Sequence, residues 1–154
     1  MKGKRAYIDT NVLVYVALKH PDFYDDCLNI LKMLVDGDYI GYGSLFVLFE
    51  LFGALSKINP KAAYEASTYY LNLPIKLLEF NRDVLELSYE ISRISRVTYD
   101  SLHAALMFYN DIGIIITEDL DDWIKIKEAW KKLIRRRIRK NKELIILSPT
   151  KGVF

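Results

Sequence analysis

Four acidic residues stand where a metal-binding carboxylate would be useful: Asp9, Glu50, Asp100 and Asp119. Asp9 directly follows the short apolar run at 6–8, and Asp119 follows the β-branched run at 114–117 in the same way. Carboxylates gathered in one crevice repel each other strongly unless a cation lies among them. Mg²⁺ and Mn²⁺ take such oxygen ligands. A cation of this kind lowers the pKa of a bound water and neutralises phosphoryl oxygens, which is the chemistry of phosphodiester hydrolysis.

Each of these acids also has a simpler interpretation. Asp9 and Asp100 could be N-caps, because aspartate satisfies free backbone N–H groups at the start of a helix. Asp119 lies among Glu118, Asp121 and Asp122, some of which are expected to form the acidic first turn of a helix. The four acids together fit this simpler interpretation less well than each does alone.

Glu50 is the most informative of the four after Asp9. It is the only charged residue between Asp38 and Lys57, in a helix expected at 45–57 that is apolar nearly all round. Burying an ionised carboxylate without a partner costs several kcal/mol or more. Glu50 is therefore expected to be paired, protonated or bound to metal, and the simpler alternative is a salt bridge to a distant Lys or Arg.

The elements that would position these acids alternate along the chain. Apolar runs predict strands at 6–8, 39–43, 75–80, 113–117 and 143–147. Helical spacing predicts helices at 12–19, 23–36, 45–57, 60–70, from 81 or 83 to 94, at 100–109, and from 119 or 121 past 130. Strands that alternate with helices indicate an α/β fold with a mostly parallel sheet. Ligands bind such folds outside the carboxyl ends of the strands, where Asp9 and Asp119 are predicted to lie.

Composition limits the protein class. The 154 residues, 51% of them hydrophobic, are enough for one globular domain, and no linker divides 1–154. The longest apolar run, at about 45–55, is broken by Glu50 and too short to span a membrane. A single cysteine, Cys27, and the absence of a signal-peptide core favour a reducing cytoplasm. With only two histidines, His20 and His103, a structural zinc site is not expected.

Four segments together resemble the PIN-domain nucleases, in particular the small VapC-type toxins of prokaryotic toxin–antitoxin pairs. They are 7–11, 44–51, 99–106 and 117–123, in the order of the family. The resemblance implies a three-layer α/β/α sandwich with a mostly parallel sheet. It also implies a Mg²⁺- or Mn²⁺-dependent endoribonuclease, commonly a homodimer that an antitoxin protein can inhibit.

By the same resemblance, Asp9, Glu50, Asp100 and Asp119 form the acidic set, and Thr10, Asn11 and Thr117 support it. Both threonines follow strands at matching places and could orient carboxylates. An extra acid departs from the family pattern, because Asp121 and Asp122 both precede Trp123. Either could supplement Asp119. His103 lies one helical turn beyond Asp100 and is predicted to be a packing residue outside the metal-binding set.

The C-terminal part of the chain is strongly basic. Residues 125–154 hold 11 Lys and Arg against 2 Asp and Glu, whereas residues 1–124 hold 11 against 18. An amphipathic helix at about 123–142 would present the basic residues, among which we select Arg135, Arg136, Arg139 and Lys140 as RNA-binding candidates. The alternatives are a solvated face and a docking surface for an acidic partner segment.

Two rival functions remain open at this point. A catalytically silent PIN-like module would bind RNA or a protein partner without cutting, although it would have no need to keep Glu50. An aspartyl-phosphate phosphatase would need a second aspartate two residues after the nucleophile, and that position is Asn11. The sequence favours the nuclease.

Overall fold

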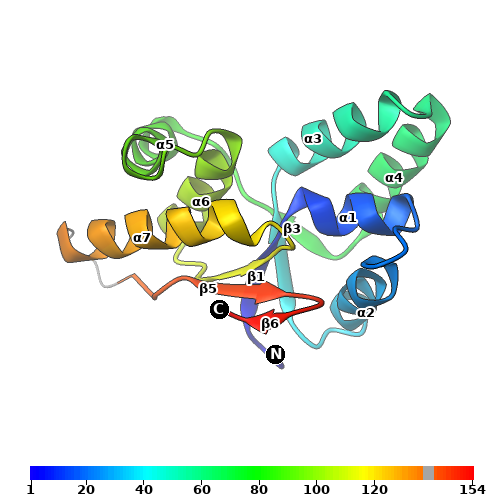
Figure 1. Cartoon of the computed structure of the whole chain (residues 1–154), viewed down its shortest axis with the longest axis horizontal. Coiled ribbons are helices and arrows are strands. Elements are labelled where there is room, and N and C mark those ends of the chain that lie inside the picture. Colours follow the sequence, from blue (N-terminus) through cyan, green and yellow to red (C-terminus); the bar gives the residue numbers. More distant parts are fainter. Residues whose placement is uncertain (137–140) are drawn as a thin grey trace.

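The structure is a computed structural model that describes residues 1–136 and 141–154. The elements are β1 (Arg5–Ile8), α1 (Thr10–Ala17), α2 (Tyr24–Val35), β2 (Ile40–Gly43), α3 (Leu45–Ser56), α4 (Pro60–Asn72), β3 (Ile75–Leu77), α5 (Arg82–Ser95), α6 (Tyr99–Tyr109), β4 (Ile114–Ile116), α7 (Leu120–Arg136), β5 (Ile145–Ser148) and β6 (Gly152–Val153). One or two helices separate successive strands from β1 to β5, and β6 follows β5 directly (Figure 1).

The strands form one sheet in the order β3-β2-β1-β4-β5-β6. All neighbouring strands are parallel except β5 and β6, which form an antiparallel hairpin at one edge. The predicted mostly parallel sheet is therefore confirmed. Since β1 and β4 are neighbours, with Tyr7 opposite Ile115 and Ile8 opposite Ile116, the residues that follow them meet at the same edge.

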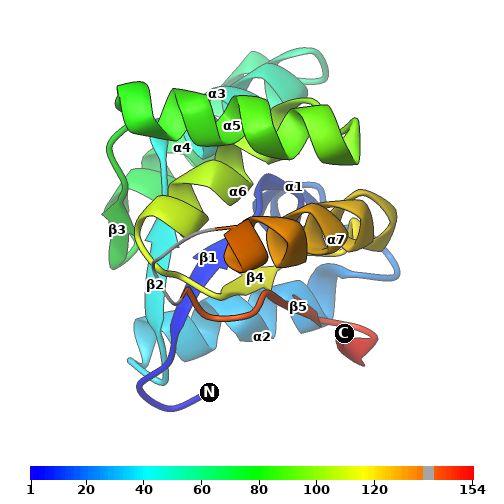
Figure 2. The same ribbon diagram turned by 90° about the vertical axis from the view of Figure 1, so that its left-hand side faces the viewer.

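Helices cover both faces of the sheet, as expected for an α/β/α sandwich (Figure 2). Neighbouring residues of β1 point to opposite faces. Ile8 lies near Gly41 on the side of α2, where a Cβ added to Gly41 would come within 2.5 Å of the Leu34 side chain. Tyr7 points to the other face and contacts His103 of α6. A larger residue at position 41 would therefore force the Leu34 side chain to move.

Capping residues mark several helix starts as the sequence predicts. The Ser44 side chain accepts a hydrogen bond from the backbone N–H of Val47 at the start of α3. Asn81 caps α5 by accepting from Val84 N at 2.9 Å. Asp9 accepts from Thr10 N at 2.8 Å at the start of α1. Local sequence therefore fixes where the helices around the strand ends begin.

Several predicted boundaries are wrong. The third strand ends at Leu77 rather than at residue 80, and the short strand β6 was not expected. The described part of the basic helix ends at Arg136, and Asn141 and Lys142 lie outside any helix, so the predicted end at 142 is wrong. Trp130 Nε1 donates to the carbonyl of Lys142 at 2.9 Å, which holds the returning chain against α7.

Two of the predicted RNA-binding residues, Arg139 and Lys140, lie outside the described residues. Arg135 and Arg136 are exposed at the end of α7. Across residues 1–136 and 141–154, no helix combines the length and the apolar character needed to cross a membrane.

Candidate metal centre

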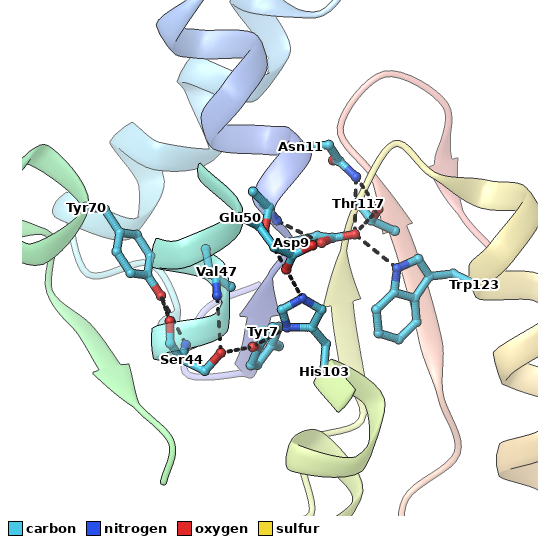
Figure 3. Close-up of polar contacts among 11 residues, drawn as sticks. Tyr7, Asp9, Asn11, Ser44, Val47, Glu50, Tyr70, His103, Thr117 and Trp123 are labelled. Carbon is cyan, nitrogen blue, oxygen red and sulfur yellow. Dashed lines mark hydrogen bonds and ion pairs between the residues drawn. The ribbon is translucent and has the colours of Figure 1, made fainter. Parts of the chain in front are cut away.

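Asp9 is almost fully buried at the carboxyl end of β1, yet it is well provided with hydrogen-bond donors. Its Oδ2 accepts from Thr117 Oγ1 at 2.7 Å, Trp123 Nε1 at 3.0 Å and Asn11 Nδ2 at 3.2 Å (Figure 3). Its Oδ1 accepts from Thr10 N. The capping interpretation is thus correct for Asp9, but the cap uses only one carboxylate oxygen. The other is oriented by neutral donors from α1, α7 and the end of β4.

Asn11 and Thr117 connect the ends of β1 and β4. Asn11 Nδ2 donates to Thr117 Oγ1 at 2.9 Å, and Asn11 Oδ1 accepts from Glu118 N at 3.1 Å. Thr117 Oγ1 also accepts from Asp119 N at 3.0 Å. Two of the three residues predicted to support the acids, Asn11 and Thr117, therefore link the loop that carries Asp119 to Asp9.

Asp100 lies in the first turn of α6, and it is not the cap of that helix, because α6 begins at Tyr99 and the cap position is Thr98. Its carboxylate belongs to two groups of possible donor atoms, each within 4.8 Å: one with Asp9 and His103, the other with Asp119 and Asp122. Burial, followed by repulsion from Asp9, raises the pKa of Asp100 to about 8. The capping alternative for Asp100 is wrong.

The four acidic residues that follow β4 have different surroundings. Glu118 accepts from Thr150 N and Oγ1 and from Ser148 Oγ, each at 2.9 Å, and so fixes the C-terminal hairpin. Asp119 turns toward Asp100, and burial raises the pKa of Asp119 above its ordinary value, with the charges of Asp122 and Asp9 adding to the effect. Of the two acids before Trp123, Asp122 lies near the cluster and Asp121 is exposed and belongs to neither group of donors.

Glu50, on α3, contacts Thr10 and His103. Its Oε1 accepts from Thr10 Oγ1 at 3.3 Å and contacts His103 Nε2 in a short hydrogen bond or ion pair. The other ring nitrogen of His103 lies 2.7 Å from Tyr7 Oη, which in turn lies 2.7 Å from Ser44 Oγ (Figure 3). A buried chain of side chains, Ser44–Tyr7–His103–Glu50, therefore leads from the start of α3 to the acidic edge.

The surroundings of Glu50 do not support the alternative of a salt bridge to a distant Lys or Arg. Its side chain is 35% exposed, and its partner among the described residues is His103 rather than a distant Lys or Arg. The helix α3 is not buried all round, because Leu45, Phe49 and Phe52 are exposed. Apolar residues thus cover the outer face of this helix, and Glu50 lies on the side that contacts Thr10 and His103.

His103 was predicted to be a packing residue, but it also contacts Tyr7 and Glu50 through its two ring nitrogens. The side chain is 1% exposed, and its burial lowers the pKa, but the Glu50 hydrogen bond and the charges of Asp9, Glu50 and Asp100 raise it to a value above the ordinary one. Tyr7 and Trp123 were missed as polar partners, because an aromatic residue in an apolar segment gives no local sign of a long-range hydrogen bond.

The donor chemistry fits a hard divalent cation. Three of the four predicted acids bring carboxylate oxygens from the end of β1, from α6 and from the loop after β4, and Asp100 shares one group of donors with Asp9 and the other with Asp119. Burial, together with the charges of neighbouring carboxylates, raises the pKa values of Asp100 and Asp119, so the ionised forms are disfavoured in the metal-free protein. A bound cation would stabilise the ionised forms. Glu50 belongs to neither group of donors among the described residues, so its part in metal binding remains a prediction.

Comparison with known proteins identifies the family. A model of the PIN domain matches residues 6–129, so the chain belongs to the PIN domain family. The architecture is also similar to that of solved VapBC and VapC structures. A chain of VapBC2 from Rickettsia felis, solved with a DNA fragment from the promoter, is 18% identical with a TM-score of 0.62, over 94% of this chain and 98% of that chain.

Two further solved structures have a similar fold. VapC20 from Mycobacterium tuberculosis, described as a toxin that cleaves the sarcin–ricin loop, is 17% identical with a TM-score of 0.64, over 77% of this chain and 93% of that chain. A chain of DNA-bound VapBC from Salmonella typhimurium is 14% identical with a TM-score of 0.64, over 95% and 98%. At these identities the likeness establishes the fold. The comparison with curated protein sequences finds no match.

Proposed function

We propose that this protein is a metal-dependent endoribonuclease and the toxin of a toxin–antitoxin pair. The observation that carries the proposal is that the Asp100 carboxylate lies with Asp9 in one group of donors and with Asp119 in another, in a chain of the PIN family. Oxygen donors from separate elements, with raised pKa values at two of them, are typical of a site for Mg²⁺ or Mn²⁺.

Each residue has a distinct role in this proposal. Asp9, Asp100 and Asp119 would hold the cation, with Asp122 as an additional donor and Glu50 binding the metal or positioning the attacking water. The cation would supply a water of lowered pKa and neutralise phosphoryl charge. Both ring nitrogens of His103 already have protein partners, so we assign His103 to positioning Glu50. In-line attack on the phosphodiester would leave a 5′-phosphate and a 3′-hydroxyl.

The proposed partners follow from exposed surfaces. Arg135 and Arg136 would attract RNA phosphates. The apolar outer face of α3 and α4 holds a groove of about 490 Å³ that Phe52, Tyr64 and Leu71 help to line, and Phe52 and Tyr64 are 49% and 69% exposed. We propose that a second copy of the chain or an antitoxin covers this face, since large exposed apolar patches mark interaction sites.

The first experiment is a cleavage assay. Purified protein and Asp9→Asn are incubated with structured and single-stranded RNA in Mn²⁺, in Mg²⁺ and in EDTA. Cutting that requires metal and is lost in Asp9→Asn, with 5′-phosphate ends on the products, is the expected result. A fully active Asp9→Asn protein would remove the assignment. RNA or partner binding without any cutting would favour the catalytically silent module instead.

A further inference from the structure

A second cavity lies between the start of α3 and the end of β3, the outermost strand at one edge of the sheet. Its volume is about 570 Å³, and it is formed by the first two turns of α3 and the segment that follows β3. Three phenylalanines line it: Phe46, Phe49 and Phe80. We refer to it as the phenylalanine cavity.

Two of the aromatic rings that line this cavity pack against each other, and two are exposed to solvent. Phe46 and Phe80 meet edge to face, with ring centroids 5.4 Å apart and an interplanar angle of 86°. Phe80 is nevertheless 44% exposed and Phe49 is 62% exposed. Exposed aromatic surface in a concave site costs free energy in the unbound protein, and a ligand that covers it recovers that free energy.

The phenylalanine cavity is linked to the acidic edge through Phe46, which lines the cavity, and His103, which contacts Glu50. The ring of Phe46 is perpendicular to the His103 ring at a centroid distance of 6.4 Å, and His103 contacts Glu50. Ser44, which also lines the cavity, is the first residue of the buried chain that reaches Glu50 (Figure 3). The cavity thus lies close enough to the carboxylates for a group that neighbours a phosphate bound there to reach it.

The polar rim of the cavity favours a base over a phosphate. Glu79 lies on the rim and is exposed. A carboxylate repels the phosphate backbone, but it accepts hydrogen bonds from the exocyclic amino groups of bases. Aromatic side chains stack on unpaired bases, because every base has a π-face and no partner in a single strand.

We propose that the phenylalanine cavity binds one unstacked nucleobase of single-stranded RNA, next to the phosphodiester that is cut. The proposal rests on the proposed nuclease function and adds to it a site that selects unpaired substrate. Phe80 provides the stacking surface, and Phe46 fixes its position relative to His103 beside the carboxylates. A base within a duplex stays stacked and cannot enter.

The test uses the full chain and short fluorescein-labelled single-stranded RNAs whose cleavage position has been mapped. Each nucleotide near that position is replaced in turn by an abasic ribose, and single-turnover rates are measured in Mn²⁺. One abasic position is expected to slow the wild-type protein about tenfold, the effect of losing one base–aromatic stack. Phe80→Ala should slow cleavage of intact RNA by a similar factor. This variant should cut the RNA with that abasic position as fast as it cuts intact RNA.

Phe154→Ala is the matched control, since Phe154 is 42% exposed but follows β6 at the opposite edge of the sheet. It should behave as the wild type on every RNA. Additive losses from Phe80→Ala and the abasic substitution would overturn the proposal. So would dissociation of a dimer by Phe80→Ala in light scattering, because a second copy would then fill the cavity.

A failure of the proposed function would look different. A wild-type protein that cuts none of the RNAs contradicts the nuclease assignment, and the same RNAs then serve in an anisotropy assay. Binding that weakens about tenfold both at one abasic position and in Phe80→Ala would still support the base site. Equal binding of every RNA by both proteins, or no binding at all, would overturn it.

Discussion

The two sides of the acidic cluster are stabilised in different ways. Asp9 is buried among neutral donors, with Thr117, Trp123 and Asn11 all pointing to one carboxylate oxygen. Asp100 faces other acids, and its pKa is raised to about 8 by burial and by repulsion from Asp9. Hydrogen bonds thus organise Asp9 before any cation binds, whereas burial and neighbouring carboxylates disfavour the ionised form of Asp100, which a bound cation would stabilise. We expect the first side to fix geometry and the second to provide the affinity for metal.

Replacing either acid by its amide should abolish cleavage, by more than about 100-fold, because each is a proposed metal ligand. The two variants should differ in stability. Asp9→Asn places an amide NH₂ against donors or leaves donors unpaired, so it should lose about 1–3 kcal/mol of unfolding free energy. Asp100→Asn removes a repelling charge and should gain stability at pH 8. Urea unfolding of both metal-free proteins checks this, and equal destabilisation by the two changes would contradict the comparison.

The pH dependence of stability should also separate the two sides. The folded-state pKa of Asp100 lies above its unfolded value, so the folded protein binds the extra proton, and stability is lost as pH rises toward about 8. The raised pKa of His103 acts in the same direction above its ordinary value. Metal-free protein should therefore become less stable between pH 5 and 8, on the order of a few kcal/mol. Thermal unfolding across this range is the measurement.

The Asp100→Asn variant provides the control for that experiment. It should show a smaller decline, with the part that belongs to His103 remaining, and added Mn²⁺ should reduce the decline in the wild type. A wild-type protein whose stability rises from pH 5 to 8 would show that Asp100 is not held in the protonated form.

Tyr7→Phe tests the buried chain that leads to Glu50. It removes the hydroxyl between Ser44 and His103, which leaves buried polar atoms unpaired and should cost about 1–3 kcal/mol of stability. It should also lower the cleavage rate by about tenfold with little change in substrate affinity, if His103 positions Glu50. The assay is single-turnover cleavage over a range of RNA concentrations.

Tyr39→Phe is the matched control for that variant. The Tyr39 hydroxyl is also buried and donates to the carbonyl of Ile30 at 3.1 Å, on α2. It should cost similar stability and leave cleavage unchanged. An identical loss of cleavage in both variants would indicate a general effect of destabilisation rather than a role for Tyr7 in the site.

The smallest effect is expected outside the cluster, on α7. Arg135→Glu with Arg136→Glu should weaken RNA binding several-fold at low salt and reduce the salt dependence of binding, without changing the rate from bound RNA. Lys61→Glu is a suitable control, because Lys61 is exposed on α4 and its single ion pair, with Glu65, is a surface pair. Equal effects of both changes would indicate only a response to net charge.

The sequence by itself determined the order of the strands and helices up to β5 and the position of Asp9 and Asp119 at strand ends. These follow from apolar periodicity and from caps such as Ser44 and Asn81, which act over a few residues. It also led to the family, which the match over residues 6–129 confirms.

Only the tertiary structure decided which neighbours each acid has. Trp123 donates to Asp9 from 114 residues away, and His103 rather than a Lys or Arg pairs with Glu50. The outer face of α3 is apolar and exposed, which the periodicity of a nearly uniform apolar helix could not reveal. Contacts of this range depend on how the elements pack around the sheet, and that packing, rather than local preference, sets the burial and the pKa of each carboxylate.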